Sequence, residues 1–119
     1  MNKSDIQKLE TIKARLIEGM TDYIADGDDS YTKADIKKCY KILEQFMARL
    51  GKLGASATET AILDYVKQAV QDLNALNSSV DGCLIETDQR EDLCAYILFA
   101  AKESGLKQDG DVTEEWREW

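Results

Sequence analysis

The fold is decided by residues 36–50, which read Ile-Lys-Lys-Cys-Tyr-Lys-Ile-Leu-Glu-Gln-Phe-Met-Ala-Arg-Leu. Apolar side chains recur there at steps of three and four residues, the spacing of one wide buried face on an α-helix. The members of this stripe are Ile36, Cys39, Tyr40, Leu43, Phe46, Met47 and Leu50. Thr32 and Asp35 have the spacing of a capping box, and Gly51 and Gly54 supply stop signals. The segment therefore predicts a long amphipathic helix that begins at Thr32 and ends at these glycines.

A second stripe precedes this helix, over residues 5–24. Its apolar positions are Ile6, Leu9, Ile12, Leu16, Met20 and Tyr23. Ser4 and Gln7 have capping-box spacing at its start. Gly19 lies inside the pattern, where glycine weakens a helix by about 1 kcal/mol relative to alanine. We therefore expect Gly19 to permit close packing against a neighbouring helix.

Two more stripes follow residue 50. Residues 56–76 carry apolar side chains at helical spacing, namely Ile62, Val66, Ala69, Val70, Leu73 and Leu76. Residues 87–104 do so through Leu93, Cys94, Ile97, Leu98 and Ala101. Gly105 followed by Leu106 resembles a Schellman ending, in which glycine takes a left-handed conformation and the next apolar residue folds back.

The last residues predict a short helix that docks on the others. Asp111 and Glu114 have capping-box spacing, so we expect a helix over residues 112–119. Trp116 and Trp119 are three residues apart and would share one face of it. Two tryptophans in so short a segment favour docking over a free tail.

These elements predict a fold class. The connections are short, no pair of segments has a hairpin signal, and Leu84 and Ile85 are expected to pack beneath the neighbouring helices. We therefore expect an all-α protein: an antiparallel four-helix bundle with a short docked C-terminal helix, forming a single helical domain over residues 1–119.

Composition excludes several kinds of function. The 119 residues carry a formal charge of −8 and include no histidine and no proline. Without histidine there is no Ser-His or Cys-His pair and no His-containing zinc site. Residues 1–60 hold 10 basic and 10 acidic side chains, whereas residues 61–119 hold 5 and 13. We expect no nucleic-acid partner and no anionic membrane partner, because both need an excess of lysine and arginine.

The expected location is the cytoplasm. The first residues lack the apolar stretch of a signal peptide, and no apolar run reaches the roughly 20 residues of a membrane span. Three cysteines, Cys39, Cys83 and Cys94, are then reduced thiols rather than a disulfide framework. Cys39 and Cys94 lie on apolar stripes and are expected to be packing residues.

The acidic turn at residues 26–30 is a weak candidate for a metal site. Asp26, Asp28 and Ser30 match the first ligand positions of an EF-hand. Tyr31 and Lys37 then fall where the glycine and the bidentate glutamate are required, so the EF-hand match fails. Asp26, Asp28 and Asp29 remain weak candidates, beside the alternative of a solvated turn.

The densest polar segment, residues 86–92, allows an enzymatic alternative. Glu86, Asp88 and Glu91 would serve a metal-dependent enzyme if they bound Mg²⁺. The competing explanation is that acidic residues are common at a helix start. Arg90 is one of two arginines after residue 60, and a guanidinium among carboxylates usually forms structural bridges. Its expected partners are either Glu86 or, in the tail, Glu114 and Glu118.

Two segments carry a family resemblance. Residues 85–91 read Ile-Glu-Thr-Asp-Gln-Arg-Glu, and residues 117–119 read Arg-Glu-Trp. They resemble a family of small bacterial proteins of unknown function that show an Ile-Glu-Thr-x-x-Arg segment at the start of a late helix and close on Arg-Glu-Trp. The family often has a histidine in the third helix, which this chain lacks. The resemblance covers about residues 36–119, supplies no activity, and implies that five residues act together, as a structural lock or a partner surface: Glu86, Thr87, Arg90, Arg117 and Trp119.

Together these features favour a non-catalytic interaction protein without a cofactor. The acidic second half suits a basic protein partner, as in immunity or antitoxin proteins by analogy, and tryptophan and arginine are enriched at interface hot spots. Trp116 joins the five residues named above as a candidate for partner binding or for the lock. One alternative is a self-associating structural homodimer, in which basic residues of one copy meet acidic residues of the other. The second alternative is the metal-dependent enzyme.

Overall fold

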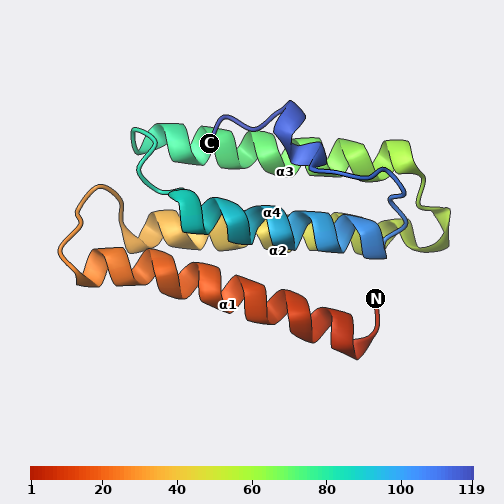
Figure 1. Ribbon diagram of the computed structural model, residues 1–119, viewed down its shortest axis with the longest axis horizontal. Coiled ribbons are helices and arrows are strands. Elements are labelled where there is room, and N and C mark those ends of the chain that lie inside the picture. Colours follow the sequence, from red (N-terminus) through yellow and green to blue (C-terminus); the bar gives the residue numbers. More distant parts are fainter.

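The computed structural model describes residues 1–119 and contains four long helices joined by short connections (Figure 1). The helices are α1 (Lys3–Ala25), α2 (Lys33–Leu53), α3 (Glu59–Ser79) and α4 (Thr87–Glu103). Two short 3₁₀ turns follow α2 and α4, namely η1 (Gly54–Ser56) and η2 (Val112–Glu115). The chain has no strand, which confirms the all-α prediction. None of the helices has both the length and the apolar character needed to cross a lipid bilayer.

Successive helices run in opposite directions along the long axis of a molecule that measures 46 × 29 × 22 Å (Figure 1). The largest interfaces are those of α1 with α4 and of α2 with α3. The chain therefore forms the predicted antiparallel four-helix bundle. Its topology places the end of α1 and the start of α4 at the same end of the molecule, although they lie far apart in the sequence.

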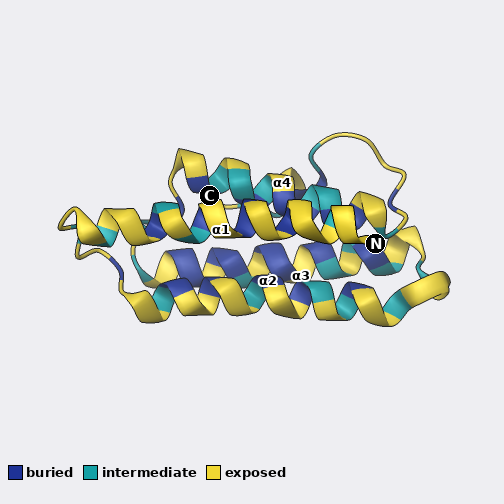
Figure 2. Cartoon of the chain, turned by 90° about the horizontal axis from the view of Figure 1, so that it is seen from below, coloured by how far each residue is buried: buried dark blue, intermediate teal, exposed yellow.

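The four helices enclose one apolar core, and their outward faces are exposed (Figure 2). The stripe over residues 36–50 contributes Cys39, Leu43 and Phe46, all fully buried. Removing such a leucine or phenylalanine side chain from water stabilises the folded state by about 1.5–3 kcal/mol. The stripe that predicts the fold is thus also a major part of its core.

Three residues predicted to be buried are exposed instead. Tyr40 on α2 is 43% exposed, while Ile6 and Tyr23 on α1 are 49% and 37% exposed. The α1–α2 interface is much smaller than the α1–α4 interface, so side chains at its margin, such as Ile6 and Tyr40, stay uncovered. Tyr23 stands beside a hollow between α1 and α4.

The N-terminal caps are partly as predicted. The cap of α1 is Asn2, two residues before the expected cap at Ser4. Asn2 Oδ1 accepts from Asp5 N at 2.8 Å, and Asp5 Oδ2 accepts from Asn2 N at 3.2 Å. This pair has the same spacing as the predicted one, so spacing alone does not choose between them. At α2 the prediction is confirmed, since Asp35 Oδ2 accepts from Thr32 N at 2.9 Å.

The turn between α2 and α3 differs slightly from the prediction. Helix α2 continues through Gly51 and ends at Leu53. Gly54 follows as its C-cap, with a φ of 50° that lies in the left-handed region. Ser56 belongs to η1 rather than to the start of α3. Thr58 is the actual cap of α3, and its Oγ1 accepts from Ala61 N at 3.1 Å.

The connection between α3 and α4 is fixed by one buried side chain. Asn77 Oδ1 accepts hydrogen bonds from Leu84 N at 3.1 Å and from Ile85 N at 3.0 Å. The side chains of Leu84 and Ile85 are buried in the core, which confirms their predicted packing. Asn77 thus replaces the helical partners that these two backbone groups lack.

Helix α4 ends in the predicted Schellman motif. Leu106 N donates to Ala101 O at 3.0 Å, and Gly105 N donates to Lys102 O at 3.0 Å. Gly105 has a φ of 120°, a backbone conformation that residues other than glycine rarely adopt. The buried Leu106 then starts the tail.

The tail runs back along α3 (Figure 1) and packs on the bundle, as predicted, but it is not a helix over residues 112–119. Only the turn η2 forms, started by Asp111, whose Oδ1 accepts from Thr113 N at 3.0 Å. Trp116 and Trp119 are half-buried and pack against the core. Arg117 N still donates to Thr113 O at 2.9 Å, but Trp116 O and Glu118 N bond to the Asn74 side chain of α3, and the helical pattern does not continue.

Candidate functional site

A polar network holds the tail to α3. The buried Asn74 donates from Nδ2 to Trp116 O at 2.8 Å and accepts at Oδ1 from Glu118 N at 3.0 Å. Its Nδ2 also lies 3.2 Å from Glu118 Oε2. Each such bond contributes about 1 kcal/mol in net terms. Asn74 is therefore the main polar attachment of the tail beyond Asp111, whereas Glu59 of α3 holds the start of the tail and accepts at Oε1 from Lys107 N at 2.7 Å and from Gln108 N at 3.1 Å.

Arg117 closes the tail on itself. Its Nη2 lies 3.1 Å from Asp111 Oδ2, and its Nη1 donates to Trp119 O at 2.9 Å. The guanidinium also stacks over the Trp119 ring, 5.4 Å from the centroid. The structure thus brings together Trp116, Arg117 and Trp119 of the predicted set, in contacts made within the tail and to α3.

Cys94 on α4 joins this network rather than the core. Its Sγ lies 3.6 Å from Thr113 Oγ1 and 3.9 Å from Asp111 Oδ2. Burial, reinforced by the Asp111 carboxylate, raises the pKa of the Cys94 thiol. A thiol in this state is a weak nucleophile, so the contacts are structural.

The other three predicted residues stand apart from the network. Glu86 and Thr87, at the start of α4, are exposed. Arg90 is half-buried and makes no ion pair, so the predicted bridges to carboxylates are wrong. Arg117 makes the tail's ion pair instead, because the tail folds back so that its own arginine reaches Asp111.

The metal candidates do not gather into a site. No group of three histidine, cysteine, aspartate or glutamate residues has the arrangement needed to hold a metal ion, in the turn at 26–30 or around Glu86, Asp88 and Glu91. Within the turn, Asp28 Oδ1 accepts from Ser30 N at 2.8 Å. Hydrogen bonding from the Ser30 side chain, and then from its backbone, lowers the pKa of Asp28. These carboxylates serve local backbone structure.

Two adjoining hollows lie along the seam between α1 and α4, with volumes of about 300 and 350 Å³. They share three lining residues, Gly19, Asp88 and Gln89. One is also lined by Asp22, Tyr23 and Asp26, and the other by Arg15, Glu91 and Asp92. Together these nine residues form what we call the α1–α4 groove.

The groove carries uncompensated negative charge. At one end Arg15 Nη2 pairs with Asp92 Oδ1 at 2.7 Å. The remaining carboxylates have no cationic partner: Asp22, Asp26, Asp88 and Glu91. Asp22 and Asp26 lie at the C-terminal end of α1, which has no basic residue in its last turn. Because the helix dipole is negative there, these two carboxylates oppose stability, and a bound cation would compensate them.

The floor of the groove is an unsatisfied amide. Gln89 is only 3% exposed, and its Oε1 has no hydrogen-bond partner. A Cβ placed on Gly19 would lie 2.9 Å from Gln89 Nε2, which confirms that Gly19 permits close helix packing. Buried amide oxygens almost always have a donor, and this one has none within the folded chain.

Two signals in the sequence point to this groove. Gln89 stands between Ile85 and Leu93 at four-residue spacing, so it is a polar residue on the buried face of α4. Asp22 and Asp26 are acidic residues in a helix end that favours basic ones. Neither signal shows that α1 and α4 meet at these positions.

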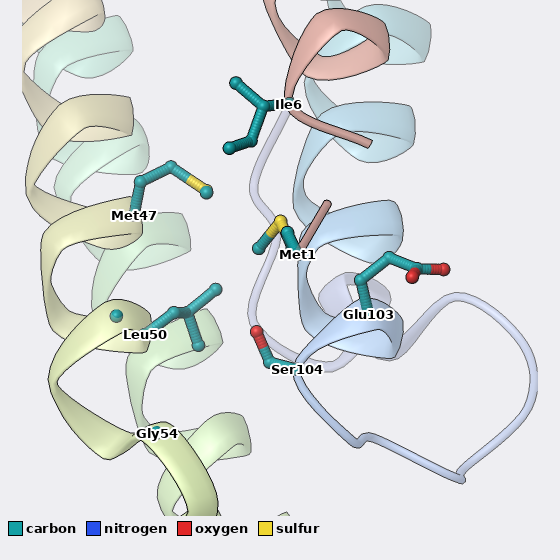
Figure 3. Close-up of a pocket in the computed structure, with 8 residues that line it drawn as sticks. Met1, Ile6, Met47, Leu50, Gly54, Glu103 and Ser104 are labelled. Carbon is teal, nitrogen blue, oxygen red and sulfur yellow. The ribbon is translucent and has the colours of Figure 1, made fainter. Parts of the chain in front are cut away.

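Apart from the two hollows of the α1–α4 groove, another hollow, of about 370 Å³, is more apolar (Figure 3). It lies where the start of α1 faces the ends of α2 and α4, and the side chains of Met1, Ile6, Met47 and Leu50 line it. Glu103 and Ser104 stand at its edge. It contains no basic or nucleophilic group beyond the Ser104 hydroxyl, so its lining provides mainly apolar contact surface.

Lys13 is the centre of a charge cluster with Glu10 and Glu44, which the sequence pattern does not predict. Its residue is 3% exposed, and its Nζ pairs with the carboxylates of Glu44 and Glu10 and lies 4.4 Å from the Tyr40 ring centroid. Burial alone would lower the pKa of Lys13, but the hydrogen bonds that its Nζ donates to Glu44 and Glu10 raise it above its ordinary value. The charged lysine with its two acceptors joins α1 to α2.

Known proteins add no further assignment. No protein family model, no curated protein and no solved structure matches this chain. The family resemblance of residues 85–91 and 117–119 therefore stays a prediction. The function has to be argued from the α1–α4 groove itself.

Proposed function

We propose that the protein is a non-catalytic interaction module whose α1–α4 groove binds a basic segment of a protein partner. The observation that carries the proposal is the pair Asp22 and Asp26 at the negative end of α1, where no cation compensates them. Carboxylates in such a position lower stability, and proteins retain such local conflicts mainly at functional sites. Immunity and antitoxin proteins, which neutralise basic partners, are the analogy for this role.

Two further observations support binding over catalysis. The groove offers carboxylates, an amide and a tyrosine ring, but it has no nucleophile paired with a base. The tail residues Trp116, Arg117 and Trp119 are held by contacts within the tail and with Asn74, which favours a structural lock for them over a second partner surface. Arg117 Nε and Trp119 Nε1 are nevertheless buried without a partner. We also propose a cytoplasmic location in a bacterium, consistent with three free cysteines.

The test compares two variants with the same change of charge. One carries Asp22→Asn, Asp26→Asn and Asp88→Asn in the groove; the other carries Asp64→Asn, Glu114→Gln and Glu115→Gln, three exposed carboxylates elsewhere. We expect the wild type and the second variant to capture a basic partner from native lysate at low salt and to release it at high salt. The groove variant should capture nothing, although it should be the more stable protein.

Two outcomes would overturn the proposal. Capture that is equally strong in the groove variant would place the interface elsewhere. A lysate without any salt-sensitive partner, together with concentration-dependent sedimentation of the pure protein, would favour the self-associating homodimer instead.

A further inference from the structure

We infer that the α1–α4 groove recognises the guanidinium of an arginine side chain presented by the partner. This inference rests on the proposed function and specifies its chemistry. Three kinds of group meet in the hollow at the end of α1: the carboxylates of Asp22, Asp26 and Asp88, the ring of Tyr23, and the amide of Gln89. Each of them favours a planar organic cation.

A metal ion does not suit the groove. Calcium and magnesium require six or more oxygen ligands at roughly 2.0–2.6 Å, and no three acidic residues of the chain are arranged to hold a metal ion. Separated carboxylates are instead suited to a cation with several donors that reach outward. The groove therefore selects for an organic cation over a metal.

The amide of Gln89 requires a donor. Its Oε1 is buried without a partner, and no hydrogen bond holds that oxygen in place. Nε2 lies on the side of Gly19, which lines both hollows. Rotation of the terminal amide exchanges the two atoms and turns the oxygen toward the groove. A donor from a ligand would then reach Oε1 from the groove, and Nε2 would take the enclosed position that the oxygen leaves.

Tyr23 distinguishes guanidinium from ammonium. Its ring is partly exposed at the wall of the hollow, beside Asp22 and Asp26. A guanidinium stacks on an aromatic ring, presents five donors in one plane and is weakly hydrated, whereas an ammonium is a compact, strongly hydrated charge. A guanidinium that stacks on Tyr23 and donates hydrogen bonds to the carboxylates and to Gln89 would use all of these properties.

The experiment measures binding of three blocked tripeptides, Gly-Arg-Gly, Gly-Lys-Gly and Gly-citrulline-Gly, to the full chain by NMR titration at low salt. Citrulline keeps the shape of arginine without its charge. We expect the arginine peptide to bind about fivefold more tightly than the lysine peptide, by the cation–π preference, and the citrulline peptide not to bind. The amide signals of Gly19, Tyr23 and Gln89 should shift most.

Two variants test the named contacts. Tyr23→Leu and Gln89→Leu should each reduce the preference for arginine over lysine to about one, while lysine binding persists. Tyr40→Leu, at a tyrosine of similar exposure outside the groove, should leave the preference unchanged. Gln89→Leu should fold at least as stably as the wild type, since it removes an unpaired buried amide.

The outcomes separate the inference from the proposed function. Equal, salt-sensitive binding of the arginine and lysine peptides in the groove would overturn the inference and leave the function standing. So would an unchanged arginine preference in both variants. Binding of neither peptide, with a groove-dependent partner still captured from lysate, would also overturn only the inference. If neither peptide binds and no groove-dependent partner is captured, the inference and the proposed function are both overturned.

Discussion

At the scale of single residues, Gly19 on α1 lies against the side-chain amide of Gln89 on α4. Glycine leaves room for the amide, and a methyl group in its place would lie 2.9 Å from Nε2. The amide stays unpaired, which is costly in a buried position. Under the proposed function, this pair of residues favours the binding surface at the expense of the stability of the isolated chain.

Two glycine variants measure this effect. Gly51→Ala, in α2, meets no atom within 4 Å and should stabilise the protein by about 0.5–1 kcal/mol through helix propensity alone. Gly19→Ala should not show this gain, because the new methyl group displaces Gln89. Urea unfolding of both variants gives the comparison. An equal gain at the two positions would mean that Gly19 has no packing role.

Asn77 makes a second prediction at this scale. Asn77→Ala removes the acceptor of Leu84 N and Ile85 N and leaves two buried donors unsatisfied, so it should destabilise the fold by about 2–4 kcal/mol. Ser78→Ala changes an exposed neighbour and should stay within about 0.5 kcal/mol of the wild type. Chemical denaturation measures both. A loss below 1 kcal/mol for Asn77→Ala would show that water replaces its oxygen.

At the scale of elements, the tail depends on α3 for its position. The chain from Asp111 onward forms only one 3₁₀ turn of its own. Its further attachment comes from Asn74 and from the packing of Trp116 and Trp119 on the core. The tail is thus a docked element whose conformation is imposed by the helix beneath it.

Asn74→Ala should release the tail without unfolding the bundle. We expect a red shift of tryptophan emission, because both tryptophans lie in the tail and would become exposed to water. We also expect faster proteolysis after Arg117, because the released backbone would be open to a protease. Asn77→Ala, an equally buried asparagine on the same helix, should keep the native emission at low denaturant. If the emission of Asn74→Ala is unchanged, apolar packing alone holds the tail.

At the scale of the whole molecule, buried protons make stability depend on alkaline pH, and three of them belong to Cys39, Tyr31 and Tyr96. Burial raises the pKa of Cys39 from 9.0 to about 12, and raises those of Tyr31 and Tyr96 from 10.0 to about 12. Between pH 9 and 12 the unfolded chain releases these protons while the folded protein retains them. Because the folded state then binds more protons, its stability falls as the pH rises.

The unfolding midpoint in urea should therefore decrease from about pH 9 and more steeply above pH 10. Tyrosinate absorbance should show that two of the five tyrosines ionise later than the rest. Tyr31→Phe should flatten the slope above pH 10. A folded protein in which all tyrosines ionise together near pH 10 would contradict this account.

Local rules were enough to predict the helices. Periodicity located all four of them, and the capping spacing of Thr32 and Asp35 located the start of α2. The same spacing placed the start of α1 at Ser4 instead of Asn2, because two pairs satisfied it. The predicted helix over residues 112–119 failed because a buried side chain of α3 competes for its backbone.

The sequence by itself determined the all-α class, the number of helices, the core stripe over residues 36–50 and the acidic second half, because each depends on neighbours within a few residues. Only the tertiary structure decided which margins of the stripes stay exposed, that Lys13 is buried, and that Arg117 rather than Arg90 pairs. It also decided the groove, which joins Asp22 and Asp26 of α1 to Asp88 and Gln89 of α4. The physical reason is that such contacts depend on which helix faces meet, and no local pattern of residues specifies that pairing.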